Sequence, residues 1–284
     1  MQLIDGKKIA ADIISEIANQ IVEENMRPQL AVLLVGNDPA SELYIKLKEK
    51  KCTETGIIFD KYLIDESQSE KEILDTIDFL NKDPEICAIL IQMPLPEKFD
   101  QEKIINKLDY KKDVDGFHPT NIKRYLEGKK QYLLPGLSLA IWNLITSTGK
   151  ENYENKKALI IAKSENFTLP TKKLLSEQNI HADIAHPDDE DLKNKCLESD
   201  ILISVIGKPN FITKDMVKKD AIIIDVGISK VGNKTVGDVD FENVAPITSY
   251  ITPVPGGVGP MTIAMLLFNT VVLARKKNES ISKK

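Results

Sequence analysis

Tyr44 and Lys48 are side chains suited to work on a substrate, and they lie four residues apart in a segment of helix-forming residues. Residues four apart share one face of a helix, so an aromatic ring and an amine would point the same way. The segment is also crowded with Lys46, Lys50 and Lys51, as an ordinary solvated helix face is. The pair alone therefore does not identify a site.

Gln92 ends the apolar run Ile86–Gln92 and precedes the rigid sequence MPLP at 93–96. A buried amide must find hydrogen-bond partners or lose about 1 to 3 kcal/mol. A ligand or a neighbouring lysine would satisfy it, and so would a purely structural turn. The sequence leaves both interpretations open.

Asp113 and Asp115 flank a single valine in KKDVDGFHP. In an extended segment both carboxylates would lie on the same side, and Gly116 permits a tight turn directly after them. Paired carboxylates suit a metal ion or a ring that presents adjacent N–H donors. His118 precedes a proline, a position that favours a capped loop residue over a catalytic base.

The segment 252–262, TPVPGGVGPMT, holds three glycines and three prolines directly before an apolar helix. Such a composition predicts close approach of the backbone to a ligand or to another segment. The free amides at a helix N-terminus favour anions and carbonyl oxygens. An ordinary interdomain turn is the alternative.

The elements that position these residues follow an α/β pattern. In the first 120 residues, a strand at Leu30–Val35 leads through Asp38 and Pro39 into a helix that ends at Gly56. A helix at 71–81 and a strand at Ile86–Gln92 follow, which indicates an open, mostly parallel unit.

A second series of strands has the spacing of a doubly wound nucleotide-binding domain. The helix after its first strand is expected to begin at about Pro170, the final helix to cover Met261–Ala274, and the tail from Arg275 to be solvated. The predicted strands are Ala158–Ala162, Ala182–Ala185, Ile201–Ile206 and Ala221–Val226.

Composition restricts the class of protein. The 284 residues suffice for about two domains, and the net charge of -5 argues against nucleic acid as a partner. No long uninterrupted apolar run predicts a membrane span or a signal peptide. The three cysteines are far apart, which predicts reduced thiols, no zinc site and a cytoplasmic location.

Six segments together resemble the bifunctional methylenetetrahydrofolate dehydrogenase and methenyltetrahydrofolate cyclohydrolase family, in order and spacing, almost from end to end. KDVDGFHP and the last segment are the most specific. The segments are ASELYIKLKEKKCTETGI (40–57), ILIQMPLP (89–96), KKDVDGFHPTN (111–121), IIIDVG (222–227), VGDVDF (236–241) and TPVPGGVGPMTIAMLLFNT (252–270).

The resemblance implies a two-domain α/β chain that forms a V-shaped homodimer, with folate held between the domains. The predicted domains are an N-terminal α/β catalytic domain, 1–122 with 262–284, and a Rossmann-type doubly wound NAD(P)-binding domain, 123–261. The C-terminal helix is expected to return to the first domain.

The resemblance also implies roles for individual residues. Tyr44 would stack on the aminobenzoate of the folate, Lys48 would be the catalytic lysine, Gln92 would orient and tune it, and Asp115 would bind the pterin. Gly256, Gly257 and Pro260 would shape the pocket floor. The positions expected at the cofactor, NADP with NAD as an alternative, are Ala162, Lys163, Ser164 and Ile228.

The implied reaction transfers hydride from the methylene bridge to the nicotinamide, and water then attacks the methenyl cation. A lysine that accepts a proton in this pocket needs a lowered pKa. Moving that pKa from about 10.4 to about 7.5 requires roughly 4 kcal/mol of desolvation or like-charge repulsion.

The sequence departs from the family on the nucleotide side. Where the family has GRSxxVGxP, residues 162–170 read AKSENFTLP, and the next strand is followed by His186, Pro187, Asp188 and Asp189. Residues 135–140 read PGLSLA where the family has PCTPxG. Cyclohydrolase activity is therefore the safer prediction. The alternatives are a cyclohydrolase with impaired dehydrogenase activity, a non-enzymatic folate-binding descendant, and a dehydrogenase with a different small substrate.

Overall fold

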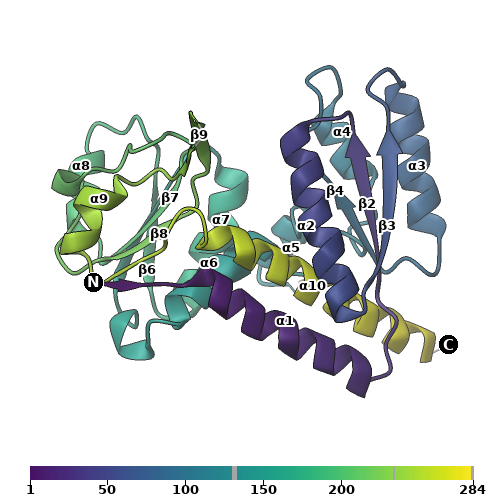
Figure 1. The fold of residues 1–284 in the computed structure, drawn as a ribbon, viewed down its shortest axis with the longest axis horizontal. Helices are drawn as coiled ribbons and strands as arrows, with labels where there is room; N and C mark the ends of the chain where they lie inside the picture. The colour runs from purple at the N-terminus through teal and green to yellow at the C-terminus, as the bar shows by residue number, and fades with distance from the viewer. Residues whose placement is uncertain (130–132, 233, 283–284) are drawn as a thin grey trace. The chain divides into compact units, whose positions relative to one another are not determined.

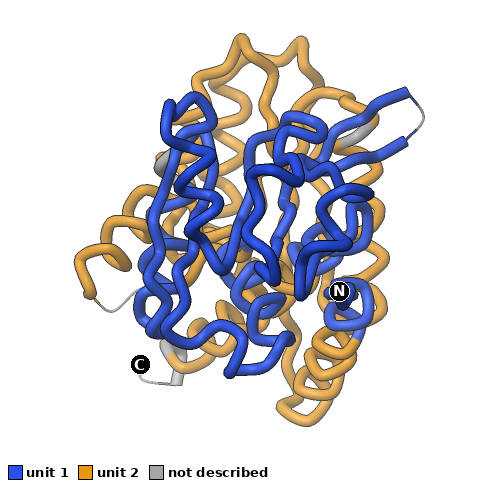
Figure 2. The backbone as a smooth tube through the Cα atoms, turned by 90° about the vertical axis from the view of Figure 1, so that its left-hand side faces the viewer, with its two compact units in different colours: residues 1–11, 137–262 blue, residues 12–136, 263–284 orange. Residues whose placement is uncertain are grey.

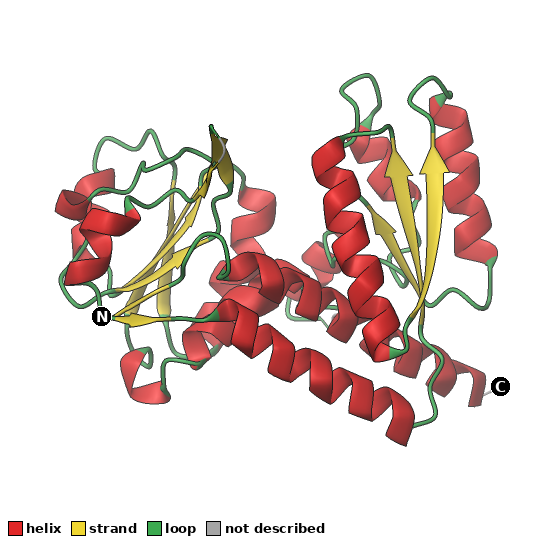
Figure 3. Cartoon of the chain, in the orientation of Figure 1, coloured by secondary structure: helices red, strands yellow, loops and turns green. Residues whose placement is uncertain are grey.

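The computed structural model describes residues 1–129, 133–232 and 234–282. The chain divides into two compact units (Figure 2), which are called unit 1 (1–11 with 137–262) and unit 2 (12–136 with 263–284). Each unit contains helices and a sheet (Figure 3). The boundaries given above for the two functional domains stay a prediction.

Unit 2 is built on a three-stranded parallel sheet with the order β3-β2-β4. Helix α1 (Gly6–Glu23) begins in unit 1 and continues into unit 2. The other elements of unit 2 before residue 137 are β2 (Gln29–Val35), α2 (Pro39–Thr55), β3 (Ile58–Ile64), α3 (Glu70–Lys82), β4 (Ala88–Ile91), α4 (Gln101–Lys107) and α5 (Pro119–Leu126).

The central strand β2 is apolar on both faces because both are covered. Leu30, Val32 and Leu34 pack in a core with side chains of α2 and of α10 (Val258–Ser282). The alternate residues Ala31, Leu33 and Val35 pack in a second core with α3 and α4. This alternation follows from the two-residue period of a strand, and it explains why the predicted strand is a continuous apolar run.

Helix α2 has the ends that the sequence predicts. The carboxylate of Asp38 accepts the backbone N–H of Ser41 at 2.8 Å, Pro39 occupies the first turn, and Gly56 closes the helix in a left-handed conformation. These caps fix where α2 begins and ends. Because α2 follows β2 directly, they also fix the position of Lys48 along the helix relative to the end of that strand.

Unit 1 contains a six-stranded sheet with the order β1-β11-β8-β7-β5-β6, in which every pairing is parallel. Figure 1 shows α8 and α9 on one side of this sheet and α6 and α7 on the other. The elements are β1 (Gln2–Leu3), α6 (Gly136–Thr146), η1 (Lys150–Asn152), β5 (Lys157–Ala162), α7 (Glu165–Glu177), β6 (His181–Ala185), α8 (Leu192–Glu198), β7 (Ile201–Val205), η2 (Lys214–Met216), β8 (Ile222–Asp225), β9 (Ser229–Val231), β10 (Lys234–Val236), α9 (Phe241–Val244), η3 (Ala245–Ile247) and β11 (Tyr250–Ile251).

In unit 1, the strands that follow β5 along the chain are added first on one side of β5 and then on the other. The chain passes from β5 to its neighbour β6 and then crosses to β7 on the other side of β5. Open α/β sheets bind ligands beyond the carboxyl ends of their strands at such a switch point. The predicted fold class, two α/β units with one doubly wound parallel sheet, is confirmed.

The prediction for the start of α7 was wrong. The helix begins at Glu165 with Ser164 as its N-cap, and Pro170 lies inside it. The prediction put proline at the first helical position, where its missing N–H costs nothing. Within the helix, the hydroxyl of Thr168 donates to the carbonyl of Ser164 at 3.3 Å.

The C-terminal helix α10 is longer than predicted at both ends, and the expectation of a solvated tail was wrong at Arg275. Asn278 and Glu279 are exposed, as that expectation has it, and residues 283 and 284 of the predicted tail lie outside the described residues. The guanidinium of Arg275 donates to both carboxylate oxygens of Glu24, at 2.8 and 2.5 Å, and to Gln20 at 2.9 Å. These bonds tie the last turns of α10 to α1 in unit 2, as bidentate arginine pairs do.

Within the described residues, the part of α10 from Val258 to Glu279 is long and apolar enough to cross a membrane by length and composition. Its apolar window is 61% buried, and Met261, Ala264 and Leu267 have 0% exposure. The core helix of a globular protein passes the same test, so this helix is weak evidence for a span.

Candidate active site

Lys48 and Gln92 meet in unit 2. The backbone N–H of Gln92 donates to the carbonyl of Leu33 at 2.9 Å, and its side-chain N–H donates to the carbonyl of Met93 at 2.7 Å. These two bonds orient the amide so that its Oε1 accepts from Nζ of Lys48 at 2.8 Å. Gln92 is 8% exposed, so this amide is a fixed acceptor at the end of β4.

Burial governs the proton affinity of Lys48. Desolvation lowers the pKa of its amine, and the nearby charge of Asp115 partly opposes that change. The fully buried Cys52, one turn further along α2, belongs to the apolar core beneath this part of the helix. An amine with a lowered pKa, held by a neutral acceptor, gives up its proton more readily than a solvated lysine does.

Asp115 lies on a sharp bend between α4 and α5, two residues after Asp113, which forms a parallel bridge with Ile89 of β4. The carbonyl of Asp115 accepts the backbone N–H of Gly136 at 3.0 Å, and Gly116 adopts φ of +77° where an added Cβ would lie 2.8 Å from the backbone of Pro135. Burial raises the pKa of Asp115 to about 6, against the opposing attraction of Lys48. The carboxylate is therefore mostly ionised at neutral pH.

The carboxylate of Asp113, unlike that of Asp115, holds the loop that follows it by hydrogen bonds. Asp113 is 4% exposed, and its carboxylate accepts N–H groups from Gly116 at 3.2 Å, His118 at 2.8 Å and Asn121 at 3.0 Å. The chain bends after Asp113 and does not continue as an extended segment. The described residues contain no group of three or more His, Cys, Asp or Glu placed to hold a metal ion.

His118 is the N-cap of α5. Its Nδ1 accepts the backbone N–H of Thr120 at 3.1 Å, and the side chain is 6% exposed. The capped loop residue, which the sequence favoured over a catalytic base, is the role that the structure shows.

Tyr44 lies one turn before Lys48 on α2 and is 37% exposed. In unit 2, Lys48 is hydrogen-bonded to Gln92 and interacts through its charge with Asp115. Tyr44 lies on the same helix as Lys48.

The glycine-rich segment at 252–262 lies in unit 1 and is backed by the start of α1. The N–H of Lys7 donates to the carbonyl of Gly256 at 3.1 Å, and a Cβ on Gly6 would lie 1.9 Å from the carbonyl oxygen of Gly257. Part of the close backbone approach predicted from the glycines is therefore made to the protein's own chain. Pro260 lies in the first turn of α10, where no N–H is needed.

Gly6 was not among the predicted site residues, because its contact with Gly257 joins segments from opposite ends of the sequence. No local pattern signals it.

The residues expected at the cofactor lie past strands β5 and β8 of unit 1. Ala162 ends β5 and is buried, while Lys163 and Ser164 are exposed in the turn before α7. Ile228 follows β8 and is 49% exposed. Parallel strands carry these residues at the same edge of the sheet.

Asp225 and Asp238 form a buried carboxylate pair under this edge, and sequence reasoning assigned them no role. Asp225 accepts N–H groups from Gly227, Asp238 and Val239 at 2.9 to 3.0 Å. Asp238 accepts from Ser204, Ile206 and Lys208. Burial raises the pKa of Asp225 to about 7. The aspartates in IIIDVG and VGDVDF, at the ends of apolar segments, were the available signal.

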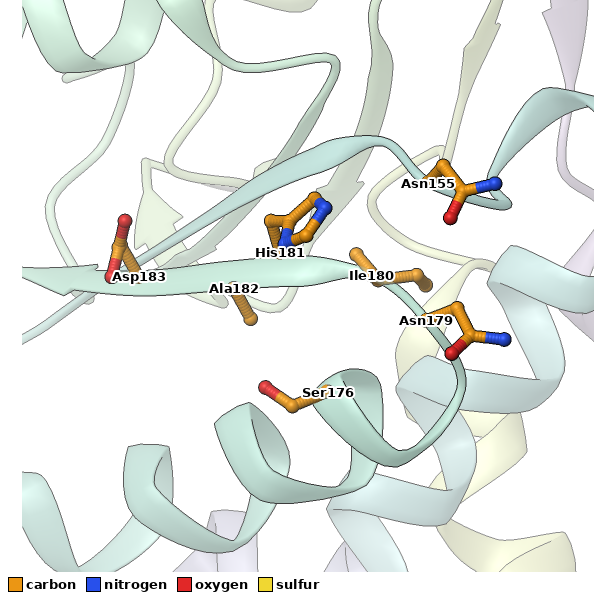
Figure 4. Close-up of a pocket in the computed structure, with 7 residues that line it drawn as sticks. All are labelled: Asn155, Ser176, Asn179, Ile180, His181, Ala182 and Asp183. Atoms are coloured by element: carbon orange, nitrogen blue, oxygen red, sulfur yellow. The ribbon is translucent and has the colours of Figure 1, made fainter.

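A depression of about 400 Å³ opens at the other end of β6, at its first residues (Figure 4). It contains none of the predicted site residues and lies at the amino end of the strand, away from the edge where α/β sheets bind ligands. Its lining is Asn155, Ser176, Asn179, Ile180, His181, Ala182 and Asp183.

A doubly wound parallel sheet with a switch point is the architecture of nucleotide-binding domains. Two family models match the chain. The catalytic domain of tetrahydrofolate dehydrogenase/cyclohydrolase matches residues 4–115, and the NAD(P)-binding domain of the same family matches residues 135–278.

Relatives match over nearly the whole chain. The bifunctional protein FolD of Nitratiruptor sp. is 45% identical over 284 residues, which cover 99% of this chain and all of the relative. The crystal structure of FolD from Campylobacter jejuni has a TM-score of 0.92 at 39% identity, covering 97% and 99% of the two chains. The Trypanosoma brucei enzyme, solved with NADP and an inhibitor, has a TM-score of 0.90 at 26% identity, covering 96% and 97%.

The chain belongs to the tetrahydrofolate dehydrogenase/cyclohydrolase family. The family predicted from the six segments is confirmed, and so is an NAD(P)-binding domain in the second part of the chain.

Proposed function

We propose that the chain oxidises 5,10-methylenetetrahydrofolate to 5,10-methenyltetrahydrofolate with NAD(P)⁺ and hydrolyses the product to 10-formyltetrahydrofolate. The observation that carries this proposal is the amine of Lys48, with its lowered pKa, held at 2.8 Å by the amide of Gln92. Membership of the family supplies the substrate class.

A bound nucleotide would supply the acceptor for the hydride that leaves the methylene carbon. The residues proposed to hold it are Ala162, Lys163, Ser164 and Ile228. The parallel sheet fits such a group, because its switch point lies at β5, next to the turn that carries the first three.

Lys48 is the proposed catalytic base of the hydrolysis. Water adds to the methenyl carbon, and the neutral amine takes up one proton of that water. The bond from the carbon to N5 then breaks, the oxygen stays on the carbon as the formyl group carried by N10, and the second proton of the water passes to N5. A lysine suits this step because a carboxylate would form an unproductive ion pair with the cationic substrate. Gln92 fixes the amine through Oε1 and adds no charge.

The remaining residues bind the folate. Asp115 accepts N–H donors of the pterin, Tyr44 stacks on the aminobenzoate, and Gly256, Gly257 and Pro260 shape the pocket floor by backbone contact. The proposed folate domain is 1–122 with 262–284, and the proposed nucleotide domain is 123–261.

We test the function by adding purified protein to methylenetetrahydrofolate with NAD⁺ or NADP⁺, and by adding it separately to methenyltetrahydrofolate. Reduced nucleotide in the first assay and loss of methenyl absorbance in the second are expected. Hydrolysis without nucleotide reduction would indicate a cyclohydrolase with impaired dehydrogenase activity. Folate binding without either reaction would contradict the proposal and support a binding protein.

We propose further that the active form is a cytoplasmic homodimer. Light scattering should give twice the subunit mass of 31.8 kDa. A mass of one subunit at micromolar concentration contradicts this part of the proposal.

A further inference from the structure

The loop after β6 lies beside the turn that follows β5. Ala185 at the end of β6 is paired with Ile161 of β5, so His186 and Ala162 are the next residues on neighbouring parallel strands. Such strands are about 4.8 Å apart. In a doubly wound sheet, an acidic side chain at the end of this second strand contacts the ribose 2′-hydroxyl of the dinucleotide. The topology therefore brings residues 186–189 to the part of the cofactor that differs between NAD and NADP.

Asp188 is the exposed carboxylate of this loop. Its side chain is 89% exposed, and it lies 3.5 Å from Nδ1 of His186. The neighbouring Asp189 is already engaged: its carboxylate accepts from Lys195 at 2.5 Å and from the backbone of Asp191 at 2.9 Å. Asp188 is thus the acid that can turn toward a ligand.

His186 turns its ring toward its own loop. Its Nδ1 accepts the backbone N–H of Asp188 at 3.2 Å, so this nitrogen is engaged within the loop.

Lys163 and Lys195 are two of the basic side chains that follow β5 and β6 in the described part of the chain. Lys163 is exposed in the turn after β5, and Lys195 is held by Asp189. The loop itself continues with Glu190 and Asp191, so its four consecutive acidic residues, 188–191, outnumber these two lysines. A 2′-phosphate placed here would meet net negative charge, whereas a 2′-hydroxyl could donate to Asp188.

We propose that this chain selects the nucleotide with a free ribose 2′-hydroxyl, NAD, over NADP, and that Asp188 is the residue that determines this preference. The inference rests on the proposed function for the identity of the cofactor. What the inference adds is the position of the residues that discriminate between NAD and NADP, the loop 186–189. The general position of the nucleotide site is expected from the sheet topology and the family.

Binding measured by calorimetry tests the proposal without any turnover. We expect NAD⁺ to bind at least about tenfold more tightly than NADP⁺, and 5′-AMP more tightly than adenosine 2′,5′-bisphosphate. Raising the salt concentration should narrow the difference, because exposed charges are screened within about 10 Å at 0.1 M salt. Equal binding of both nucleotides, or tighter binding of NADP⁺, overturns the proposal.

Two variants locate the effect. In Asp188→Ser the preference for NAD⁺ should fall at least threefold, mainly through tighter binding of NADP⁺, and in Asp188→Arg it should reverse. Asp183→Ser is the matched control, because Asp183 is an exposed acid on the same strand whose side chain lies 3.2 Å from Lys172. A change in Asp183→Ser as large as in Asp188→Ser would show that only overall charge matters, and it would contradict the assignment.

The outcomes separate this inference from the proposed function. Protein that binds NAD⁺ selectively but does not turn over methylenetetrahydrofolate contradicts the function and leaves the inference standing. Protein that oxidises the folate faster with NADP⁺ and binds NADP⁺ more tightly contradicts the inference alone.

Discussion

The surroundings of Lys48 in unit 2 and the proposed nucleotide edge of unit 1 differ in how firmly their side chains are held by hydrogen bonds and burial. Lys48 donates to the side-chain amide of Gln92, and Gln92 is itself fixed because its backbone N–H and its side-chain N–H each donate to a backbone carbonyl. Asp115 lies on a loop that the buried carboxylate of Asp113 anchors. At the nucleotide edge, Lys163, Asp188 and Ile228 are exposed beyond the strand ends.

The difference accounts for where the sequence departs from its family. A proton transfer needs groups held within tenths of an ångström, so the residues around Lys48 cannot change independently. The choice between two nucleotides depends on charge in an exposed loop, where substitutions disturb little of the fold. Substitutions on the nucleotide side therefore leave the proposed role of Lys48 unaffected.

The largest expected effect is on catalysis. Lys48→Met should slow methenyltetrahydrofolate hydrolysis about 10²- to 10⁴-fold, because the proton acceptor is lost, while folate affinity changes only a few-fold. Lys46→Met is the control, since Lys46 is an exposed lysine on the same helix. Initial rates and equilibrium folate binding measure both. Unchanged hydrolysis in Lys48→Met would remove the catalytic assignment.

The two aspartates should separate stability from binding. Asp113→Ala should lower the free energy of unfolding by roughly 2 to 4 kcal/mol, since three N–H donors lose their acceptor. Asp115→Ala should leave unfolding nearly unchanged and weaken folate binding much more than nucleotide binding. Urea unfolding and calorimetry give the two quantities. If Asp115→Ala proved as destabilising as Asp113→Ala, the division of roles would be wrong.

Substitutions beside the buried aspartates of unit 1 should lower the stability of the protein. A Cβ on Gly237 would lie 1.9 Å from the carboxylate of Asp225, so Gly237→Ala should cost about 1 to 3 kcal/mol of stability. Gly259→Ala is the comparison, because the space around Gly259 is open. Thermal unfolding of the two variants measures the contrast, and equal melting temperatures would contradict it.

The smallest effect is a pH dependence of folate binding. The pKa of Asp115 is raised to about 6, so its carboxylate takes up a proton as the pH falls from 7 to 5. Protonation removes the acceptor for the pterin N–H groups, and affinity should decrease about tenfold over this range. Asp115→Asn should bind weakly, with little change between pH 5 and 7. A wild-type affinity that is constant over this interval would argue against Asp115 as the ionised pterin acceptor.

The sequence predicted elements whose signals are local. The strand at Leu30–Val35 was predicted from its apolar run, and α2 from the caps Asp38 and Gly56. The short strand β1 was missed, because its two residues have no pattern and its partner β11 lies near the other end of the chain. Strand β3 was also missed, since Asp60 and Lys61 interrupt its apolar residues.

The same division applies to the site. Lys48, Gln92 and Asp115 were singled out because they lie in motifs, and their roles stay a prediction. The structure shows the hydrogen bond between Lys48 and Gln92. The clamp around Asp113 and the contact between Gly6 and Gly257 depend on tertiary packing. The sequence could show that these residues were present but not what they touch.

The burial of Cys52 has a consequence for the durability of the enzyme. This residue lies one turn of α2 beyond Lys48, close to where a methenyl cation, an electrophile, would form. Burial raises the pKa of the Cys52 thiol to about 12, so at neutral pH the residue stays a thiol and the nucleophilic thiolate is scarce. If the reaction takes place at Lys48 as proposed, the protein keeps a nearby sulfur atom in a form that resists alkylation by the intermediate.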